Sequence, residues 1–310
     1  MQLSSKMGLI LQLVISLSLF VEIKAAGGSF SYDNYGADWT ATCQTGTSQS
    51  PINLDQILSK VDTNLGEFSF TNYDKINKYG NIINTGTTIQ VNMADTTVTM
   101  SGGGLDGNGF TLAQFHFHWG QTSLTGSEHT IDNKMYPLEV HFVHYKTSDG
   151  DLGTAAGNPG GLAVLGFMFE LSGSDNSDLD FFINQIKDVS TKDSTGVSLT
   201  SKPAVQTIFR GVDTSKFFRY SGSLTTPGCN EVVQWTVFLE PIKISEAQMT
   251  KIRATYQDNG TTIIGYNYRP IQSQGTRTVK MSYEPDVSGS PTLSVSSILV
   301  ATIFAFYSVL

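Results

Sequence analysis

The sequence predicts a single mainly β domain with a few short helices. Runs rich in β-branched and aromatic residues dominate the middle of the chain, and clusters of Gly, Asn, Asp and Ser separate them. Only two segments carry a helical pattern. Hydrophobic residues make up 39% of the 310 residues and charged residues 15%, which is enough for one large core. Single β-rich domains often exceed two hundred residues.

Six runs are predicted as strands, and they cover residues 88–93, 96–100, 114–119, 138–145, 162–171 and 231–239. The glycine run 102–104 is predicted as a turn, because it lacks the strand-then-helix setting and the Lys of a phosphate loop. Residues 179–189 place apolar side chains at helical spacing, and residues 245–256 begin with a Ser cap and an early Glu. Both segments are predicted as helices.

All five histidines lie between residues 114 and 146. His116 and His118 point the same way from one predicted strand, because side chains alternate faces along a strand. His141 lies on the next predicted strand, and a hairpin or meander connection would place it beside the first. Three neutral imidazoles can bind a tetrahedral zinc ion and leave its fourth position open, as catalytic sites do.

Two polar residues strengthen this interpretation. Gln114 lies two positions before His116, and Glu139 lies two positions before His141, so each pair shares one strand face. Metal-bound histidines usually donate their second ring N–H to a carboxylate, amide or carbonyl. The alternatives are a structural His-x-His pair and a solvated strand carboxylate. Apolar neighbours of Glu139 argue against the second alternative.

The net charge and the two terminal segments indicate which partners and which cellular location to expect. The formal net charge of -8 argues against a nucleic-acid surface or a polybasic membrane surface. Residues 1–26 are predicted as a secretory signal peptide, since Lys6 precedes an apolar run that ends before Ala25 and Ala26. A spanning helix is the alternative, but the run is shorter than the ~20 residues that a bilayer requires.

The C-terminal segment 285–310 is predicted as a spacer and a lipid-anchor (GPI) addition signal. Small residues at Ser288, Gly289 and Ser290 precede a short polar spacer and an apolar tail. A true tail anchor is the alternative, weakened by the short span and the absence of a following basic residue. The attachment residue stays open, and residues 27–284 remain as the catalytic domain.

Seven blocks stand out between Phe30 and Tyr283, in the order SQSPINL, QFHFHWG, GSEHTIDN, PLEVHFVH, YSGSLTTPGC, VVQWTVFLEPI and NYRPIQ. Together they resemble the α-class carbonic anhydrases of the secreted and membrane-anchored type. The resemblance implies a large, twisted, mostly antiparallel central sheet with a few short peripheral helices. It also implies a metal in a conical cleft.

The resemblance assigns roles to individual residues. His116, His118 and His141 would bind Zn²⁺. Thr225 matches a gatekeeper hydroxyl that accepts a hydrogen bond from a zinc-bound hydroxide and donates one to Glu128. Without the histidines, Thr225 would be a turn hydroxyl and Glu128 a loop carboxylate.

The resemblance also implies an apolar wall that receives carbon dioxide. Its residues are Val143, Val164, Leu224, Val233 and Trp235, and without the family each would be interpreted as a core residue. Thr226 matches a second Thr that lines the substrate side. His129 and His144 are interpreted as structural.

Two covalent features are expected outside the site. The only two cysteines, Cys43 and Cys229, are expected to form one disulfide in a secreted chain, as matching positions do in the family. Two free buried thiols are the alternative. The single sequon, Asn259-Gly260-Thr261, predicts a glycan if it is accessible.

The chain departs from the family at two positions. Thr87 occupies the place where fast members carry a proton-shuttle histidine, so turnover is expected to depend on external buffer. Gly228 stands where the family often has a second proline before the cysteine, which is expected to loosen the loop behind Thr225.

The leading hypothesis is an enzyme that hydrates carbon dioxide reversibly to bicarbonate and a proton through a zinc-bound hydroxide. It would act on the extracellular face of the plasma membrane or as a secreted protein, with a bicarbonate or proton transporter as a candidate partner. A catalytically silent binding or matrix module is the alternative from another class. A zinc esterase would use the same site, but a narrow Val-lined pocket disfavours bulky esters.

Overall fold

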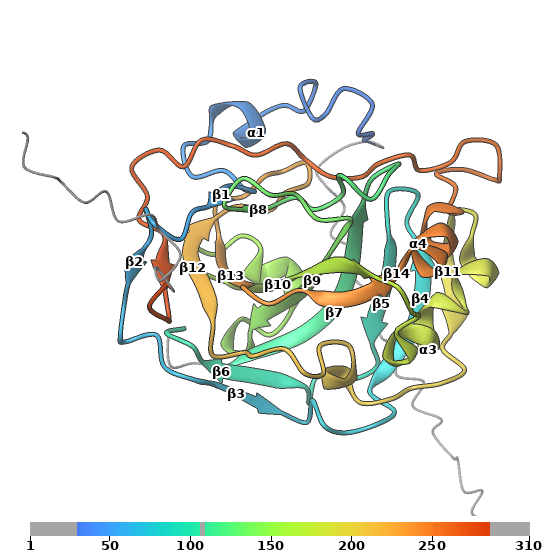
Figure 1. Cartoon of the computed structure of the whole chain (residues 1–310), viewed down its shortest axis with the longest axis horizontal. Helices are drawn as coiled ribbons and strands as arrows, with labels where there is room; N and C mark the ends of the chain where they lie inside the picture. The colour runs from blue at the N-terminus through green and yellow to red at the C-terminus, as the bar shows by residue number, and fades with distance from the viewer. Residues whose placement is uncertain (1–29, 106–108, 286–310) are drawn as a thin grey trace, which may run out of the picture.

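One large sheet organises the computed structural model, which describes residues 30–105 and 109–285 (Figure 1). Its main path runs in the order β11 (Asp193–Ser198), β4 (Tyr79–Asn84), β5 (Ile89–Met93), β7 (Phe110–Trp119), β9 (Leu138–Lys146), β10 (Leu162–Ser172), β13 (Val233–Phe238), β12 (Phe217–Gly222), β15 (Lys280–Met281) and β2 (Lys60–Val61). Three further strands attach to this path, namely β3 (Phe68–Thr71), β6 (Thr99–Gly102) and β14 (Ile242–Ser245). β1 (Asn53–Leu54) and β8 (Thr130–Ile131) form a separate pair.

Strand pairing is mostly antiparallel. Within the large sheet, β10 runs parallel to β13 and β14, and β15 runs parallel to β2. The central strands β5, β7 and β9 are antiparallel to both of their neighbours along the path, and β10 is antiparallel to β9. The predicted mainly β, mostly antiparallel architecture is therefore confirmed.

The helices are short and lie at the periphery. The α-helices are α1 (Thr42–Thr45), α2 (Leu152–Ala155), α3 (Asp180–Ile183) and α4 (Glu246–Arg253). Single 3-10 turns are η1 (Thr147–Asp149), η2 (Ser177–Leu179), η3 (Ile186–Val189) and η4 (Val205–Thr207). No helix in residues 30–105 and 109–285 is long and apolar enough to span a bilayer.

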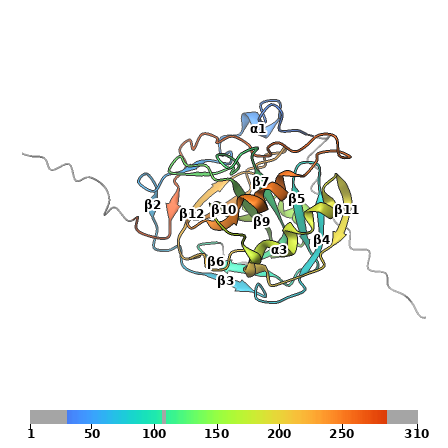
Figure 2. The ribbon, with the colours of Figure 1, turned by 45° about the vertical axis from the view of Figure 1, so that its right-hand side comes forward.

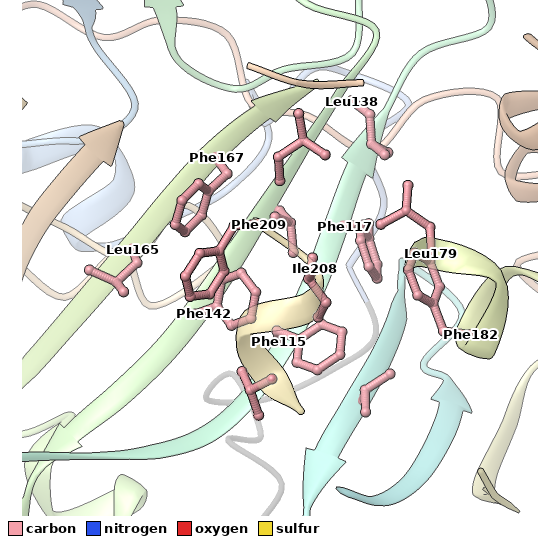
Figure 3. Close-up of a cluster of buried hydrophobic side chains, with 14 of the residues drawn as sticks. Phe115, Phe117, Leu138, Phe142, Leu165, Phe167, Leu179, Phe182, Ile208 and Phe209 are labelled. Atoms are coloured by element: carbon pink, nitrogen blue, oxygen red, sulfur yellow. The ribbon is translucent and has the colours of Figure 1, made fainter. Parts of the chain in front are cut away.

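A phenylalanine-rich core covers one face of the sheet (Figure 3). Phe115 and Phe117 of β7 point into this core and are buried. Because side chains alternate along a strand, Gln114, His116 and His118 of the same strand point to the opposite face. The core thus fixes which face of β7 presents the histidines.

Five of the six predicted strands coincide closely with observed strands, and the sixth begins late. The run 96–100 corresponds to β6, which starts only at Thr99. The Asp95 carboxylate accepts hydrogen bonds from the N–H and the hydroxyl of Thr97, at 2.8 and 2.6 Å. This Asx-type turn holds residues 95–97 out of the strand.

One helix prediction is confirmed. The other is wrong, because the predicted segment does not form one continuous helix. α4 begins after Ser245, whose hydroxyl accepts a hydrogen bond from the N–H of Gln248 in a capping box. The segment predicted as one helix, 179–189, is broken into η2, α3 and η3. Its buried Gln185 bonds the carbonyl of Ser198 and the N–H of Thr200, so tertiary contacts override local propensity here.

The glycine run 102–104 is a turn, as predicted. All three residues have positive φ, at 78°, 58° and 72°, and a Cβ on Gly103 would lie 2.3 Å from the Phe68 ring. Only glycine fits both conditions. The predicted signal peptide and the predicted lipid-anchor signal lie outside the described residues.

Candidate metal centre

Three histidines converge on the face of the sheet opposite the phenylalanine core. His116 pairs directly with His141 in the register of β7 and β9, and His118 follows two residues later on β7. One ring nitrogen from each histidine lies within 4.8 Å of the others. His118 and His141 are almost fully buried, each 1% exposed.

Each imidazole has one ring nitrogen committed to a protein acceptor. His116 Nδ1 donates to Gln114 Oε1 at 2.9 Å, and His141 Nε2 donates to Glu139 Oε1 at 2.7 Å. His118 Nδ1 donates to the backbone carbonyl of Asn267 at 2.7 Å. These contacts fix the tautomers and leave His116 Nε2, His118 Nε2 and His141 Nδ1 to face one another.

The residues fit a metal ion. His118 Nε2 is buried and has no hydrogen-bond partner among the described residues, although an unpaired buried nitrogen is costly. Burial, followed by interaction with His141, lowers the pKa of His118 to about 3, so its imidazole is neutral. Three neutral imidazoles are the donor set of open zinc sites.

A second group of metal-type side chains, His129, Glu139 and His141, is explained without a metal. Glu139 Oε1 accepts from both His141 and His129, at 2.7 and 2.8 Å. Glu139 Oε2 accepts the N–H groups of Glu128 and His129. Burial alone would raise the pKa of Glu139, but His129 and His141 outweigh it and hold that pKa well below its usual range.

Glu128 and Thr225 face each other beside the histidines. Glu128 Oε1 accepts the N–H of Arg269 at 2.8 Å, and Oε2 has no well-aligned hydrogen-bond partner among the described residues. Burial raises the pKa of Glu128 well above its usual value, opposed by the Arg269 N–H and the Thr225 hydroxyl. Glu128 Oε2 is also 3.9 Å from His141 Nδ1, the ring nitrogen that faces the cluster. The structure thus brings together the histidines, Glu128 and Thr225.

An apolar wall adjoins His141. Val164 on β10 pairs with Val143 on β9 and with Trp235 on β13, and Val233 lies on the same cluster. Leu224 packs against this cluster, and Thr226 is half-buried in the loop after β12. The Trp235 ring centroid is 4.7 Å from that of His141. All six residues predicted to receive substrate therefore lie in this cluster or in the loop beside it.

The two remaining histidines do not join the metal cluster. His129 bonds Glu139 through Nδ1 and the Tyr220 hydroxyl through Nε2, at 2.8 and 2.6 Å. His144 points to the opposite face of β9, where it bonds the Tyr73 hydroxyl and the carbonyl of Phe142. Both are buried and fully engaged, which agrees with the structural roles expected for them.

Thr87 lies in the turn between β4 and β5, at the rim of a cavity of about 170 Å³. Its hydroxyl is 3.0 Å from that of Thr85, and its carbonyl accepts from the Asn267 amide at 2.8 Å. The cavity is also lined by Tyr32 and Gln257. No histidine in the described part of the chain lines this cavity, because all five are placed elsewhere.

The predicted disulfide is present between Cys43 and Cys229, with Cα atoms 5.0 Å apart. It joins α1 to the loop that carries Thr225. In that loop Gly228 has φ 102°, which a proline could not adopt. The sequon residue Asn259 is exposed on a separate turn, so it is accessible.

Two residues that position the site were not predicted individually from the sequence. Asn267 orients His118 through its carbonyl, and its side chain also bonds Trp119 N–H and the Phe117 carbonyl. Arg269 donates its N–H to Glu128, while its guanidinium bonds the Cys43 carbonyl. Both lie in the block NYRPIQ, but their partners are more than a hundred residues away in sequence. The only sequence signal for Asn267 and Arg269 was that both lie in this block.

Comparison with known proteins agrees with this geometry. Residues 33–283 match the family described as eukaryotic-type carbonic anhydrase. The chain is 32% identical to carbonic anhydrase 15 of Mus musculus over 294 residues, covering 90% of each protein. It is 33% identical to carbonic anhydrase 4 of Rattus norvegicus over 247 residues, covering 79% of this chain and 78% of the relative. It is 31% identical to carbonic anhydrase 4 of Oryctolagus cuniculus over 252 residues, covering 80% of each. The chain therefore belongs to the eukaryotic-type carbonic anhydrases, enzymes that hydrate carbon dioxide.

Proposed function

We propose that this carbonic anhydrase is zinc-dependent and interconverts carbon dioxide and bicarbonate outside the cell. The observation that carries the proposal is the convergence of three neutral imidazole nitrogens, each oriented by a hydrogen bond through its other ring nitrogen. A zinc ion bound there would be a Lewis acid that makes water nucleophilic near neutral pH. Three protein ligands leave room for that water.

Thr225 and Glu128 orient the reacting groups. Glu128 Oε1 already accepts the N–H of Arg269, so Oε2 is the oxygen left to accept from Thr225. A Thr225 hydroxyl that donates to Glu128 presents only its lone pairs toward the histidines. The hydroxyl proton then points toward the carboxylate oxygen that has no other hydrogen-bond partner among the described residues.

The apolar wall supports a small, uncharged substrate. Val143, Val164 and Trp235 pack side by side next to His141 and offer no hydrogen-bonding group on the β-branched side chains. A linear molecule such as carbon dioxide needs orientation and a dry surface rather than polar recognition. Bulky esters would not fit as well beside two valines.

The proposed location rests on the two predicted terminal signals. The disulfide supports it, because disulfides persist in oxidising compartments such as the secretory pathway. The exposed sequon is compatible with the same route. On an extracellular membrane face, the enzyme's small-molecule substrates would connect it to a bicarbonate or proton transporter.

Stopped-flow carbon dioxide hydration, with zinc measured on the same sample, tests the proposal. We expect about one zinc per chain and rapid hydration, with Thr225→Ala losing on the order of 100-fold in kcat/KM while it keeps its zinc. Thr225→Ser retains the hydroxyl and is the matched control. Full zinc occupancy without hydration would favour a silent binding or matrix module instead.

A further inference from the structure

An apolar tip stands out on the surface of the molecule. Ile57 and Leu58 are 80% and 77% exposed, and Val61 on β2 is 37% exposed. They account for three of the nine exposed large hydrophobic residues in the described part of the chain. Contiguous exposed apolar patches, rather than single side chains, mark contact surfaces, and Ile57 and Leu58 are adjacent in the chain.

Hydrogen bonds within the turn hold the apolar tip in a defined conformation. Asp55 Oδ1 accepts the N–H groups of Ile57 and Leu58 at 2.9 and 3.0 Å, and the Asp55 carbonyl accepts the N–H of Ser59 at 2.9 Å. These bonds satisfy the backbone of the turn locally. The turn therefore has a defined conformation in which the side chains of Ile57 and Leu58 stay exposed.

The tip lies where the described chain ends. β2, directly after it, pairs with β15, and the Tyr283 hydroxyl donates to Gln56 Oε1 at 3.1 Å. Pro285, the last described residue, follows two positions later. Ser288, Gly289 and Ser290, which the sequence suggests for lipid attachment, lie only three to five positions further along the chain. Such a spacer reaches roughly 10–18 Å at full extension.

Cationic side chains accompany the apolar tip. Lys60 pairs with Lys280 in the register of β2 and β15, and both are exposed. Lys280 bonds Asp62 at 2.8 Å, whereas Lys60 has no ion-pair partner among the described residues. Apolar side chains next to a free lysine suit the boundary between lipid headgroups and acyl chains.

We propose that Ile57 and Leu58 insert into the bilayer surface and set the orientation of the anchored enzyme. The inference rests on the C-terminal lipid anchor of the proposed function. The tether is short enough to hold the tip at the membrane, so a bilayer is the surface that this tip meets continuously. The apolar face of an interfacial helix enters about 5–10 Å into the headgroup boundary, and we expect the two side chains of the tip to reach the same region.

This orientation keeps the cavity beside Thr87 away from the bilayer. β2 forms one end of the sheet path, whereas β11, β4 and β5 form the other (Figure 2). The β4–β5 turn with Thr87 is therefore separated from β2 by seven strand spacings, roughly 30 Å. The Asn259 turn lies at the same far end, since the Asn84 amide of β4 bonds the Tyr256 carbonyl at 2.8 Å. A glycan there would not collide with the bilayer.

Tryptophan fluorescence of the full anchored protein tests the inference. The three native tryptophans are buried, each at most 4% exposed, so their emission forms a constant background. Protein purified with its anchor is placed in phosphatidylcholine–phosphatidylserine vesicles that contain lipids brominated near the headgroup. We expect Ile57→Trp to shift to shorter wavelength and to be quenched beyond wild type, with unchanged carbon dioxide hydration.

Leu124→Trp is the matched control. Leu124 is 83% exposed, and its neighbour Ser123 bonds Glu246 of α4, on the opposite side of the molecule from β2 (Figure 1). Its emission should match that of a fully hydrated tryptophan in the same vesicles. Equal quenching of Ile57→Trp and Leu124→Trp would overturn the inference.

Release by phosphatidylinositol-specific phospholipase C tests the anchor separately. Release together with quenching of Ile57→Trp supports both proposals. Release without quenching overturns the membrane contact and leaves the anchor intact. Quenching without release supports the membrane contact and overturns the lipid anchor. A shift of Ile57→Trp that depends on protein concentration without vesicles would identify a second copy of the chain as the occupant and overturn the inference.

Discussion

At the residue scale, the hydrogen bonds behind the histidines decide how strongly the site can bind a metal. Gln114 accepts from His116 Nδ1, and this bond leaves Nε2 as the free nitrogen. A histidine without such a partner can rotate and change tautomer. The acceptors thus pre-organise the three imidazoles.

We expect Gln114→Leu to lower zinc affinity by about 10–100-fold, because removing a hydrogen-bond partner of a ligand typically has this effect. Competition with a fluorescent chelator measures the affinity. Gln114→Glu keeps an acceptor at the same distance and is the control. Equal zinc affinity for Gln114→Leu and wild type would show that Gln114 does not orient His116.

Thr87 carries the second residue-scale prediction. We expect turnover to rise with buffer concentration, because Thr87 cannot carry protons from the cleft to solvent. Thr87→His places an imidazole beside the cavity of about 170 Å³, and its pKa lies in the range needed to relay protons. In dilute buffer, kcat should rise by roughly tenfold or more, while kcat/KM stays the same.

Stopped-flow hydration at several buffer concentrations measures the effect of Thr87→His. Thr87→Val has a similar shape and no titratable group, so it should behave like wild type. Wild-type turnover that ignores buffer concentration would contradict the missing-shuttle argument.

At the scale of elements, the loop between β12 and β13 shows how one glycine serves the site. This loop carries Thr225 and is tied to α1 by the disulfide. Gly228 has φ 102° and Cys229 has φ 43°. The sequence suggested that a glycine in place of proline loosens the loop, whereas the observed backbone requires a residue that tolerates positive φ.

We expect Gly228→Ala to lower the free energy of unfolding by about 1 kcal/mol. Gly228→Pro should lower it further, because proline fixes φ near -65°. Urea unfolding with the disulfide intact measures both changes. A Gly228→Pro protein as stable as wild type would mean that the loop can adopt another backbone conformation.

At the scale of the whole molecule, a histidine far from the metal cluster couples folding to pH. Burial lowers the pKa of His144 from 6.5 to about 3, opposed by its hydrogen bonds to the Phe142 and Ala163 carbonyls. In the unfolded chain, His144 binds a proton below about pH 6.5. In the folded chain, it binds a proton only when the pH falls to about 3. Its contribution to stability is therefore complete above about pH 6.5 and is lost as the pH falls toward 3.

Between pH 6 and pH 4, this one group should add about 1.4 kcal/mol per pH unit to the slope of stability against pH. We expect His144→Gln to flatten the slope by up to that amount, since Gln keeps hydrogen-bonding groups but does not titrate. Urea unfolding of both metal-free proteins across this range measures the slopes. Equal slopes would mean that His144 binds its proton in the folded state.

The sequence by itself determined the face of β7 and of β9 that carries the histidines. The period-two spacing of Gln114, His116 and His118, and that of Glu139 and His141, left no other arrangement on regular strands. It also indicated six of the fifteen strands in the described residues, namely β5, β6, β7, β9, β10 and β13, because their runs of β-branched and aromatic residues are bounded by turn residues. The start of α4 could also be predicted, because the residues of its capping box lie only three positions apart.

Only the tertiary structure decided which distant groups complete the site. Asn267 meets His118, and Arg269 meets Glu128, across sequence separations of 149 and 141 residues. The break in the helix predicted at 179–189 depends on Gln185 bonding Ser198 and Thr200. Local sequence reports periodicity and propensity, which act within a few residues. Contacts between distant segments depend on how the whole sheet packs, and no local pattern encodes that packing.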